Sequence, residues 1–476
     1  MKSTQMTTKK LLENSIHSHY KKAQKNTQEK INQEASEIVR DLDIAERVDK
    51  MSENESYITL KDHKDNFQNN PKVRLINPAK TEIGKISKIY LEEINDTIQS
   101  LSKLERWQST IETLDWFNSL KNKKDLSFLQ LDIVDFYPSI SKELIEKSLN
   151  FAKKFVYISD IQKRAILNAR KTLLFNEKIP WQKNTGLSDV TQGGLDSCQI
   201  CELVGLFILH QMKVKFPWLN MGLYRDDGLA CYERMPGPLL EKRKKEIIKL
   251  FQENGLQITI ATNLKSVDFL DVNLNLCTEK HKPYKKPNNE ILYVNKMSNH
   301  PNTVLKEVPH SVSMRLQHIS SSSIEFDEAK SEYEKALKKS GYSFKLEYHE
   351  DNKKKDGNQK KNEKKKRSRK IIWYNPPFNS ASKVNIGQRF LKLLDKHFPP
   401  SNKLHKIFNR NTVKVSYSCT KNMKRIIQSH NSKILTLEKN EKSDKTCSCP
   451  KTKKENCPLS NKCLSSYVIY RATVKK

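Results

Sequence analysis

The fold is decided by one stretch of sequence, Phe128-Leu129-Gln130-Leu131-Asp132-Ile133-Val134-Asp135-Phe136-Tyr137-Pro138-Ser139-Ile140. Apolar residues fill alternate positions of its first half, a pattern typical of a β-strand with buried side chains. Asp132 lies at the far end of this strand, where packing gives no reason for an acid. We therefore take Asp132 as a candidate functional residue.

A second stretch carries two more acids, Gly222-Leu223-Tyr224-Arg225-Asp226-Asp227-Gly228-Leu229-Ala230. Its two short apolar arms flank an Arg-Asp-Asp-Gly turn, which predicts a β-hairpin with Asp226 and Asp227 at the tip. Adjacent aspartates repel each other unless a cation neutralises them, and hard carboxylate oxygens suit Mg²⁺. Two such ions can clamp the attacking and leaving oxygens of phosphoryl transfer.

The alternative reading of these acids is structural. Asp-Asp-Gly is a common turn sequence, and taken alone it is more typical of a solvated hairpin loop. Asp132 alone would likewise be an ordinary strand-end acid. The conjunction of both on β elements, in a strongly basic chain, favours a metal site.

The amino-acid composition indicates which class of molecule the chain binds. The chain has 476 residues, with 87 Lys and Arg against 55 Asp and Glu, which gives a net charge of +32. A surplus of this size favours a polyanionic partner such as nucleic acid. The 36% hydrophobic content suffices for more than one core and excludes a wholly disordered chain.

No stretch of the sequence predicts membrane insertion or secretion. The longest apolar run, Cys201 to Leu209, is short and contains Glu202. No signal-peptide core follows Met1. Nine cysteines are too few for a secreted disulfide scaffold. We therefore expect an intracellular protein of the nucleus, the cytoplasm or both, with no membrane partner.

Several elements can be predicted from local patterns. We expect strands at Tyr57 to Leu60, Val73 to Ile76 and Ile291 to Val294, and a helix at Phe326 to Lys339. Ile83 to Leu120 has helical spacing of its apolar residues. In 353–370, eleven of eighteen residues are Lys or Arg and none is apolar, which predicts a solvated linker.

The two acidic stretches resemble motifs A and C of a reverse transcriptase palm. In this resemblance Asp132 is the motif A metal ligand, and Asp226 with Asp227 is the motif C pair. Tyr137 stands where the family keeps an aromatic gate that excludes a sugar 2′ hydroxyl. Asp135 stands near the triphosphate and contributes through its backbone.

Val190-Thr191-Gln192-Gly193-Gly194-Leu195-Asp196-Ser197 resembles motif B, a glycine turn that leads into a helix from Cys198 to Lys215. The resemblance implies that Gln192 and Gly193 touch the incoming nucleotide and the template base. Many relatives have Pro-Gln-Gly-Ser here, so Thr191 and Gly194 depart from the motif.

Further segments of the chain resemble the other motifs of the reverse transcriptase family, but more weakly. Lys265, after Asn254-Gly255-Leu256-Gln257-Ile258, is the candidate general acid that protonates pyrophosphate, and Phe269 to Leu274 resembles the turn that grips the primer. Arg74 and Lys61, in stretches that resemble the fingers strands, would hold the triphosphate. A planar guanidinium matches phosphate bidentately, so Arg74 is the stronger candidate, and Lys61 could equally be a solvated surface residue.

The last hundred residues resemble the region after the polymerase in Penelope-like retroelements. The resemblance rests on Asn375-Pro376-Pro377-Phe378, on Lys403 to Val413, and on a C-x-C-x7-C-x5-C cluster followed by Tyr467 to Val474. Only what looks like the first strand of a GIY-YIG endonuclease is present, so we expect no endonuclease activity from this chain.

The spacing of the four cysteines in this cluster also suggests a metal site. Its four thiols among polar neighbours suit tetrahedral Zn²⁺, and the alternative is a set of reduced cysteines in a tail. The cluster consists of Cys447, Cys449, Cys457 and Cys463.

The fold implied by the resemblance is α+β: a right-hand polymerase with a ferredoxin-like palm, α/β fingers and a helical thumb. The expected division of the chain is a loosely packed basic helical arm (1–50), fingers (51–127), palm (128–280), thumb (281–350), Lys-rich linker (351–370), connector (371–440), and the cysteine cluster with a truncated GIY-YIG start (441–476).

The implied activity is RNA-directed DNA polymerisation by a mobile element. Two Mg²⁺ ions, held by Asp132 and Asp226 with Asp227 assisting, would serve attack of a primer 3′ hydroxyl on a dNTP. RNA template, DNA primer or target, and dNTPs are the expected partners. Two alternatives stay open: an inactive or domesticated copy that only binds nucleic acid, and a polymerase that uses a DNA template or none.

Overall fold

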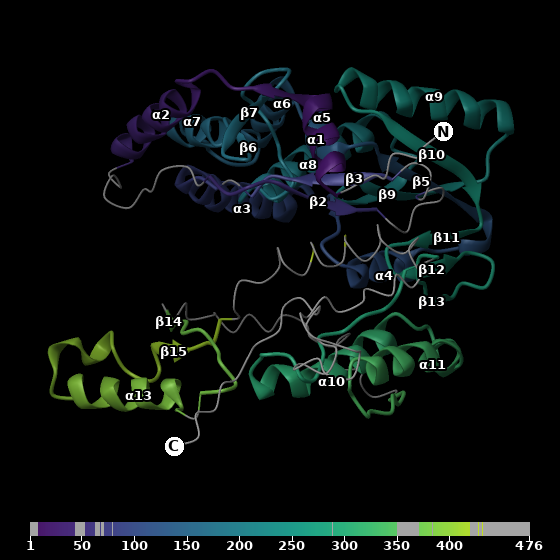
Figure 1. Ribbon diagram of the computed structural model, residues 1–476. Helices are drawn as coiled ribbons and strands as arrows, with labels where there is room; N and C mark the ends of the chain where they lie inside the picture. The colour runs from purple at the N-terminus through teal and green to yellow at the C-terminus, as the bar shows by residue number, and fades with distance from the viewer. Residues whose placement is uncertain are drawn as a thin grey trace, which may run out of the picture.

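The computed structural model describes residues 8–42, 53–61, 67, 71–78, 80–287, 289–349, 371–382, 384–418, 427 and 431. Helices and mostly antiparallel strands are both abundant, which confirms the predicted α+β class. The predicted Lys-rich linker and the cysteine cluster of Cys447, Cys449, Cys457 and Cys463 lie outside the described residues. Figure 1 shows the order of the elements along the chain.

The largest sheet in the described residues has five strands, in the order β10-β5-β9-β8-β4. All neighbouring pairs are antiparallel except β4 with β8. The predicted strand at the start of the deciding stretch is β5, an inner strand between β10 and β9. The bounds are β4 Glu105–Arg106, β5 Leu126–Ile133, β8 Asn220–Tyr224, β9 Asp227–Glu233 and β10 Ile258–Leu264.

The connections of this sheet follow a βαββαβ pattern. Helices lie between β5 and β8, a hairpin joins β8 to β9, and one helix lies between β9 and β10. Counted along the chain, the four antiparallel strands have the spatial order 4-1-3-2 of a ferredoxin-like sheet. The helices are α5 Phe136–Ser139, α6 Lys142–Ala152, α7 Asp160–Asn168, α8 Ser197–Lys215 and α9 Gly237–Glu253.

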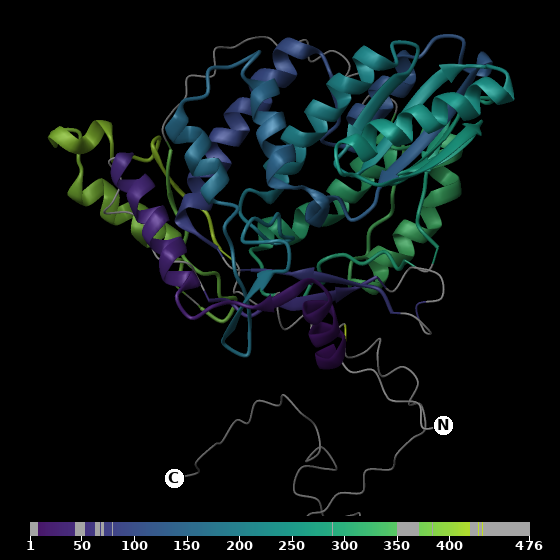
Figure 2. The ribbon, with the colours of Figure 1, turned by 90° about the horizontal axis from the view of Figure 1, so that it is seen from above.

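The largest core lies between the sheet and the helices. Leu129, Leu131 and Ile133 of β5 pack into it together with the apolar residues of α8. Because residues on successive turns all around α8 are buried, including Ile200, this helix runs through the interior rather than along the surface. Figure 2 shows α9 lying against the sheet.

The other face of the sheet carries a second, smaller core. Phe128 of β5 and Leu229 of β9 belong to it, so the two faces of each strand serve different cores. A short three-stranded sheet, order β11-β12-β13, and α4 complete this layer. Their bounds are α4 Thr110–Ser119, β11 Ser266–Phe269, β12 Val272–Asn275 and β13 His281–Pro283, and a 3₁₀ turn, η2 Lys123–Asp125, precedes β5.

The helical pattern expected from Ile83 to Leu120 is interrupted. The structure has α3 Glu82–Ser102, then β4, then α4. Lys103 caps α3 in the left-handed conformation with φ 51°, which ends the helix despite the continuing apolar spacing. The predicted strands Tyr57–Leu60 and Val73–Ile76 are confirmed as β2 and β3, an antiparallel hairpin.

The N-terminal segment is not the loosely packed arm that its polar composition predicts. It forms α1 Thr8–His19, β1 Tyr20–Lys22 and α2 Thr27–Asp41, and β1 pairs with β7 in the sheet β1-β7-β6. The few apolar residues each reach an apolar patch: Ile16 is 1% exposed and packs with Leu174 and Trp181. Strands β6 and β7 span Leu174–Asn176 and Ile179–Lys183.

The segment after the sheet is mainly helical, as predicted for 281–350. Its helices are α10 Asn302–His318 and α11 Ser323–Lys339, and α11 contains the predicted helix. The strand predicted at Ile291 to Val294 is wrong, since these residues form no ladder. Side-chain bonds hold them instead: the Tyr342 hydroxyl donates to the Val294 carbonyl at 2.9 Å.

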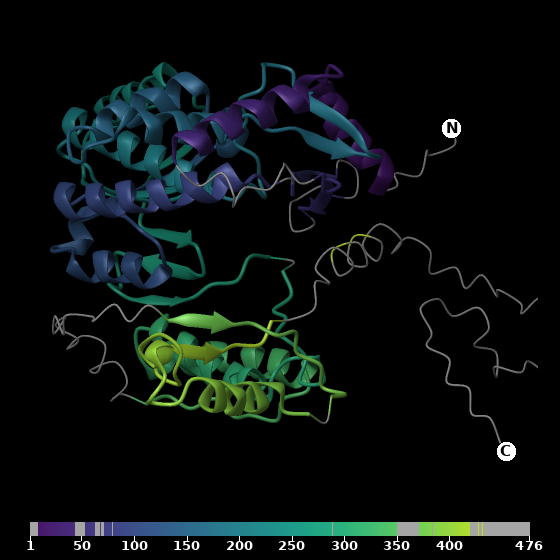
Figure 3. The same ribbon diagram turned by 90° about the vertical axis from the view of Figure 1, so that its left-hand side faces the viewer.

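Residues 371–382 and 384–418 form a small βαβ unit that we call the C-terminal module. It consists of β14 Ile372–Tyr374, α13 Ile386–His397, the 3₁₀ turn η3 Lys403–Lys406 and β15 Val413–Val415. The strands β14 and β15 pair in parallel. Figures 1 and 3 place the module beside α10. Within the described part of the chain, no helix has the length and apolar character needed to cross a membrane.

Candidate active site

The structure brings the two acidic stretches together. In the antiparallel register of β5 and β9, Asp132 stands directly opposite Asp227. The Ile133 amide donates to the carbonyl of Asp226 at 3.0 Å, which ties the hairpin tip to the end of β5. Opposed residues of such a pair have Cβ atoms about 5 Å apart. The two acidic stretches therefore lie side by side in one sheet.

These aspartates face away from the larger core. Leu129, Leu131 and Ile133 alternate with Asp132 along β5 and point into the helix-covered core. Asp132 therefore shares the opposite face with Phe128 and, across the register, Asp227 shares it with Leu229. Asp132 is exposed and Asp227 is half-buried. The carboxylates lie where a ligand can reach them.

The hairpin tip has the predicted form. Strand β8 ends at Tyr224, β9 begins at Asp227, and Arg225 adopts a left-handed backbone with φ 56°. Gly228 is required beside the acids, because a Cβ there would lie 2.7 Å from Leu131 Cδ1. The Arg225 guanidinium lies 5.5 Å from the centre of the Tyr224 ring, at the tip itself.

The predicted Mg²⁺ site can be tested against the side chains that the structure brings together. Among the described residues no group of three or more His, Cys, Asp or Glu side chains is close enough to hold an ion. Two opposed carboxylates on neighbouring strands still offer the hard oxygens that Mg²⁺ prefers, and this ion commonly completes its shell with water and substrate phosphates. The donor set therefore fits Mg²⁺.

Tyr137 reaches the hairpin tip from α5. Burial raises the pKa of its phenol well above the ordinary value, and the neighbouring Cys201, Cys198, Arg225 and Asp226 also act on it. The half-buried ring packs against the larger core. Asp135 precedes it as the residue before α5, with a left-handed φ of 44°, and its carbonyl accepts from the Ser139 amide at 3.1 Å.

The Gln192-Gly193 turn lies against the end of β3. The Asn77 amide donates to the Gln192 carbonyl at 2.9 Å. Gly193 has φ 108°, and a Cβ there would lie 2.6 Å from the Asn77 carbonyl oxygen, so only glycine fits. Behind the turn, Asp196 before α8 forms a buried ion pair with Arg170, with both side chains 3% exposed. The predicted motif B turn is thus fixed to the β2–β3 hairpin.

The basic residues of the β2–β3 hairpin share the face that meets this turn. Ile76 Cγ2 would lie 3.1 Å from a Cβ on Gly193. Arg74, two residues before Ile76, lies on the same face and pairs with Thr59. Lys61 follows two residues after Thr59 and bonds through its amide to the Lys72 carbonyl at 2.9 Å. The opposite face packs on Leu11 and the hydrophobic residues around it.

Lys265 is not brought to the aspartates. Its ammonium donates to the carbonyls of Lys124 at 2.9 Å and Leu126 at 2.5 Å. These carbonyls lie at the first end of β5, whereas Asp132 lies at the last. The geometry gives Lys265 a structural contact with the start of the strand.

The predicted primer-gripping turn joins three elements. Asp271, between β11 and β12, accepts from Arg315 of α10, with Nη2 at 2.5 Å and Nε at 3.0 Å. Its other oxygen accepts from the Thr110 hydroxyl at 2.5 Å. The turn is therefore braced between α4 and α10.

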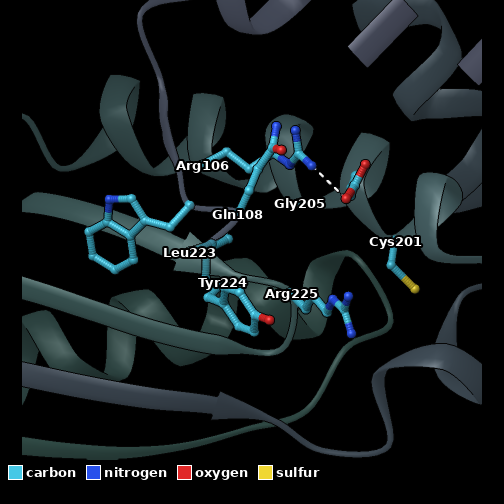
Figure 4. Close-up of a pocket in the computed structure, with 9 residues that line it drawn as sticks. Arg106, Gln108, Cys201, Gly205, Leu223, Tyr224 and Arg225 are labelled. Atoms are coloured by element: carbon cyan, nitrogen blue, oxygen red, sulfur yellow. Dashed lines mark ion pairs between the residues drawn. The ribbon is translucent and has the colours of Figure 1, made fainter. Parts of the chain in front are cut away.

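One polar cluster beside the tip was not singled out as functional from the sequence. A cavity of about 170 Å³ lies between β4, α8 and the hairpin, and Figure 4 shows its lining. The Arg106 and Glu202 side chains form an ion pair at 2.5 Å, and Arg106 is 6% exposed. In the sequence, the signal for this ion pair is Glu202, the single acid inside the longest apolar run, Cys201 to Leu209. The pair fixes α8 to β4.

Comparisons with known proteins give structural likeness only. No family model matches the chain, and no curated protein matches its sequence. Telomerase from Candida albicans, solved with an RNA fragment, aligns with TM-score 0.47 and 12% identity over 70% of this chain and 59% of that one.

Two viral RNA-dependent RNA polymerases also align. The picobirnavirus polymerase does so with TM-score 0.34 and 12% identity over 44% of this chain and 41% of that one. The BmCPV polymerase does so with TM-score 0.39 and 11% identity over 66% and 30%. All three TM-scores lie below 0.5, so these likenesses establish no function for this chain.

Proposed function

We propose that this chain is an RNA-directed DNA polymerase. The observation that carries the proposal is the register that sets Asp132 opposite Asp227, with Asp226 at the adjoining turn. Mg²⁺ ions bound there would stabilise charge on the attacking and leaving oxygens of nucleotidyl transfer. Asp132, Asp226 and Asp227 hold the ions in this proposal, on the sheet face turned away from α6 and α8.

Residues around the aspartates would position the nucleotide. The face of the β2–β3 hairpin with Arg74 and Lys61 offers cations to a triphosphate, and it adjoins the Gln192-Gly193 turn. The neighbourhood of Tyr137 and Asp226 supports the gate role, because a ring there would contact the sugar and exclude a 2′ hydroxyl. Asp135 holds the backbone turn that presents Tyr137.

In this proposal the ferredoxin-like sheet is a palm, the β2–β3 hairpin with α3 belongs to the fingers, and α10 with α11 forms a thumb. The net charge of +32 supports binding of primer and template through their phosphates. Such binding weakens steeply as salt rises, because counterions are released on association.

The kind of element is a finer proposal and rests on sequence motifs. The Asn375 to Phe378 phrase, the Lys403 to Val413 stretch and the four cysteines from Cys447 support a Penelope-like retroelement, with Zn²⁺ on the cysteines. In the same proposal the chain acts in transposition with DNA as primer and target.

Primer extension tests the proposal. The full chain is supplied with an RNA template, a DNA primer, dNTPs and Mg²⁺, and the same reaction is run on a DNA template. We expect extension on RNA and its loss in Asp226→Asn, with duplex binding nearly unchanged. Equal extension by parent and variant contradicts the aspartate assignment, and binding without extension by the parent favours a protein that only binds nucleic acid.

A further inference from the structure

The C-terminal module has one covered and one open sheet face. Helix α13 covers the first: the Tyr374 ring stacks on Phe390 with centroids 4.1 Å apart and planes at 24°. A Cβ on Gly387 would lie 3.2 Å from Val415 Cγ1, on the same face. Because side chains alternate along a strand, Trp373 points to the opposite face.

The open face presents an aromatic ring beside a cation. In the parallel register Trp373 of β14 pairs with Lys414 of β15, so the two side chains are neighbours. Trp373 is 55% exposed, and Lys414 is exposed. Parallel strands are normally covered on both faces, so this face is atypical without a partner.

The charge of the module indicates what that partner is. Its single described acid, Asp395, is already bonded by Arg410, with two oxygens at 2.9 and 3.1 Å from Nε. Against this acid stand seven exposed basic residues: Arg389, Lys392, Lys396, Lys403, Lys406, Arg410 and Lys414. The module as a whole therefore attracts a phosphate backbone, and Lys414 is the cation that its open sheet face presents.

We propose that this face of the module binds single-stranded nucleic acid, with an unpaired base stacked on Trp373 and the adjoining phosphate paired with Lys414. Stacking of bases on exposed aromatic rings within a positive groove is the usual physics of such binding. In a duplex the faces of the bases are already stacked on one another, so the platform selects unpaired strands. The proposal goes beyond nucleotidyl transfer and does not require it.

The module is fixed relative to α10, so a bound strand would have a defined place. Asn299, just before α10, donates to the Phe378 carbonyl at 3.3 Å and accepts from the Ser380 amide at 2.8 Å. Figure 3 shows β14, β15 and α13 beside the green helices of that region.

Intrinsic fluorescence gives a direct test, because Trp373 is the most exposed tryptophan. Trp107, Trp116 and Trp181 are 3–6% exposed and Trp218 is half-buried. The full chain is titrated in EDTA, without dNTPs, with a homopolymeric single-stranded oligonucleotide. We expect quenching that Trp373→Phe removes. Equal quenching in parent and Trp373→Phe overturns the proposal.

Affinity supplies the second readout. Trp373→Ala should weaken single-strand binding about tenfold and leave blunt-duplex binding within twofold, while Trp373→Phe keeps most of the affinity. Tyr157→Ala removes a ring that is 87% exposed elsewhere and is the matched control, expected to match the parent.

Two outcomes overturn the inference. One is equal loss of single-strand and duplex affinity in Trp373→Ala. The other is a parent that sediments as a dimer that Trp373→Ala dissociates, with single-strand affinity unchanged, which would make the face an interface between copies. Because the assay contains neither metal nor nucleotide, it can succeed even where the polymerase proposal fails.

Discussion

Asp132 of β5 and Asp227 of β9 stand opposite each other in the antiparallel register, on the sheet face turned away from the larger core. Two like charges so placed destabilise the sheet, by a few tenths of a kcal/mol up to about 1 kcal/mol. A bound divalent cation converts this repulsion into shared coordination. The pair therefore links stability to metal binding.

Removing one charge of the pair should separate stability from activity. Asp132→Asn is expected to leave the melting temperature equal or slightly higher in EDTA, because the repulsion is gone. Primer extension should fall by about 100-fold or more, since an ion ligand is lost. Melting curves with and without Mg²⁺ check this: Mg²⁺ should stabilise the parent and have little effect on the variant. Equal stabilisation of both would contradict the metal site.

Replacing Gly193 in the Gln192-Gly193 turn should lower both stability and nucleotide affinity. Gly193→Ala should destabilise the chain by about 1–3 kcal/mol and raise the KM for dNTP, because the new Cβ meets the Asn77 carbonyl at 2.6 Å. Gly186→Ala is the matched control, since Gly186 also has a positive φ, 135°, but nothing lies within 4 Å of its Cβ. Denaturant unfolding and dNTP titrations measure both. Identical behaviour of the two variants would show that backbone strain alone acts.

Arg74 should act on nucleotide binding. Arg74→Ala is expected to raise the KM for dNTP about tenfold with a smaller change in kcat, and Arg74→Lys to recover part of the loss, because lysine keeps the charge without the planar fork. Arg234→Ala changes an exposed arginine beyond the opposite end of β9 and should match the parent. An unchanged KM in Arg74→Ala would remove this residue from the nucleotide site.

Lys265 should matter for stability and not for proton transfer. Lys265→Met removes the bonds to the Lys124 and Leu126 carbonyls and should cost about 1 kcal/mol of unfolding free energy. The extension rate at saturating dNTP should stay within about twofold. A large fall in kcat with unchanged stability would restore the general-acid assignment.

Glu325 at the start of α11 gives a pH dependence. Burial would raise the pKa of its carboxyl, but bonds from Lys280 and Ser322 outweigh it and lower the pKa to about 2 from 4.5. The folded pKa is depressed, so this stabilisation is present above pH 4.5 and is lost as pH falls toward 2. Glu325→Gln should lower the melting temperature at pH 7 and flatten its fall between pH 4.5 and 2. Parallel curves for parent and variant would contradict this assignment.

Patterns of local spacing predicted the strands around the site. The alternation in the deciding stretch and the arms around the Asp-Asp turn each identify a strand, and the structure confirms β5, β8 and β9. What joins them is not local: the register of Asp132 with Asp227 depends on Gly228, whose missing side chain leaves room for Leu131 and Leu223. The sequence alone shows Gly228, but it does not show that Leu131 and Leu223 pack against this position.

Other features lay beyond local patterns for similar reasons. The N-terminal segment has sparse apolar residues, yet Ile16 is buried because Leu174 and Trp181 come to it from a distant hairpin. The interval after Ser102 continues a helical spacing, but the left-handed Lys103 ends the helix. Lys265 lies far from the aspartates because β10 runs antiparallel to β5. Thr259, near the start of β10, pairs with Asp132, whereas Leu264, next to Lys265, pairs with Phe128 near the first end of β5.

The most direct test of the central claim is metal-dependent incorporation of a labelled dNTP by the full purified chain on an RNA template with a DNA primer. The proposal predicts incorporation that requires Mg²⁺ or Mn²⁺ and is lost in Asp132→Asn and Asp227→Asn, while both variants still bind the primer–template. Binding by the parent with no incorporation in either metal would contradict it.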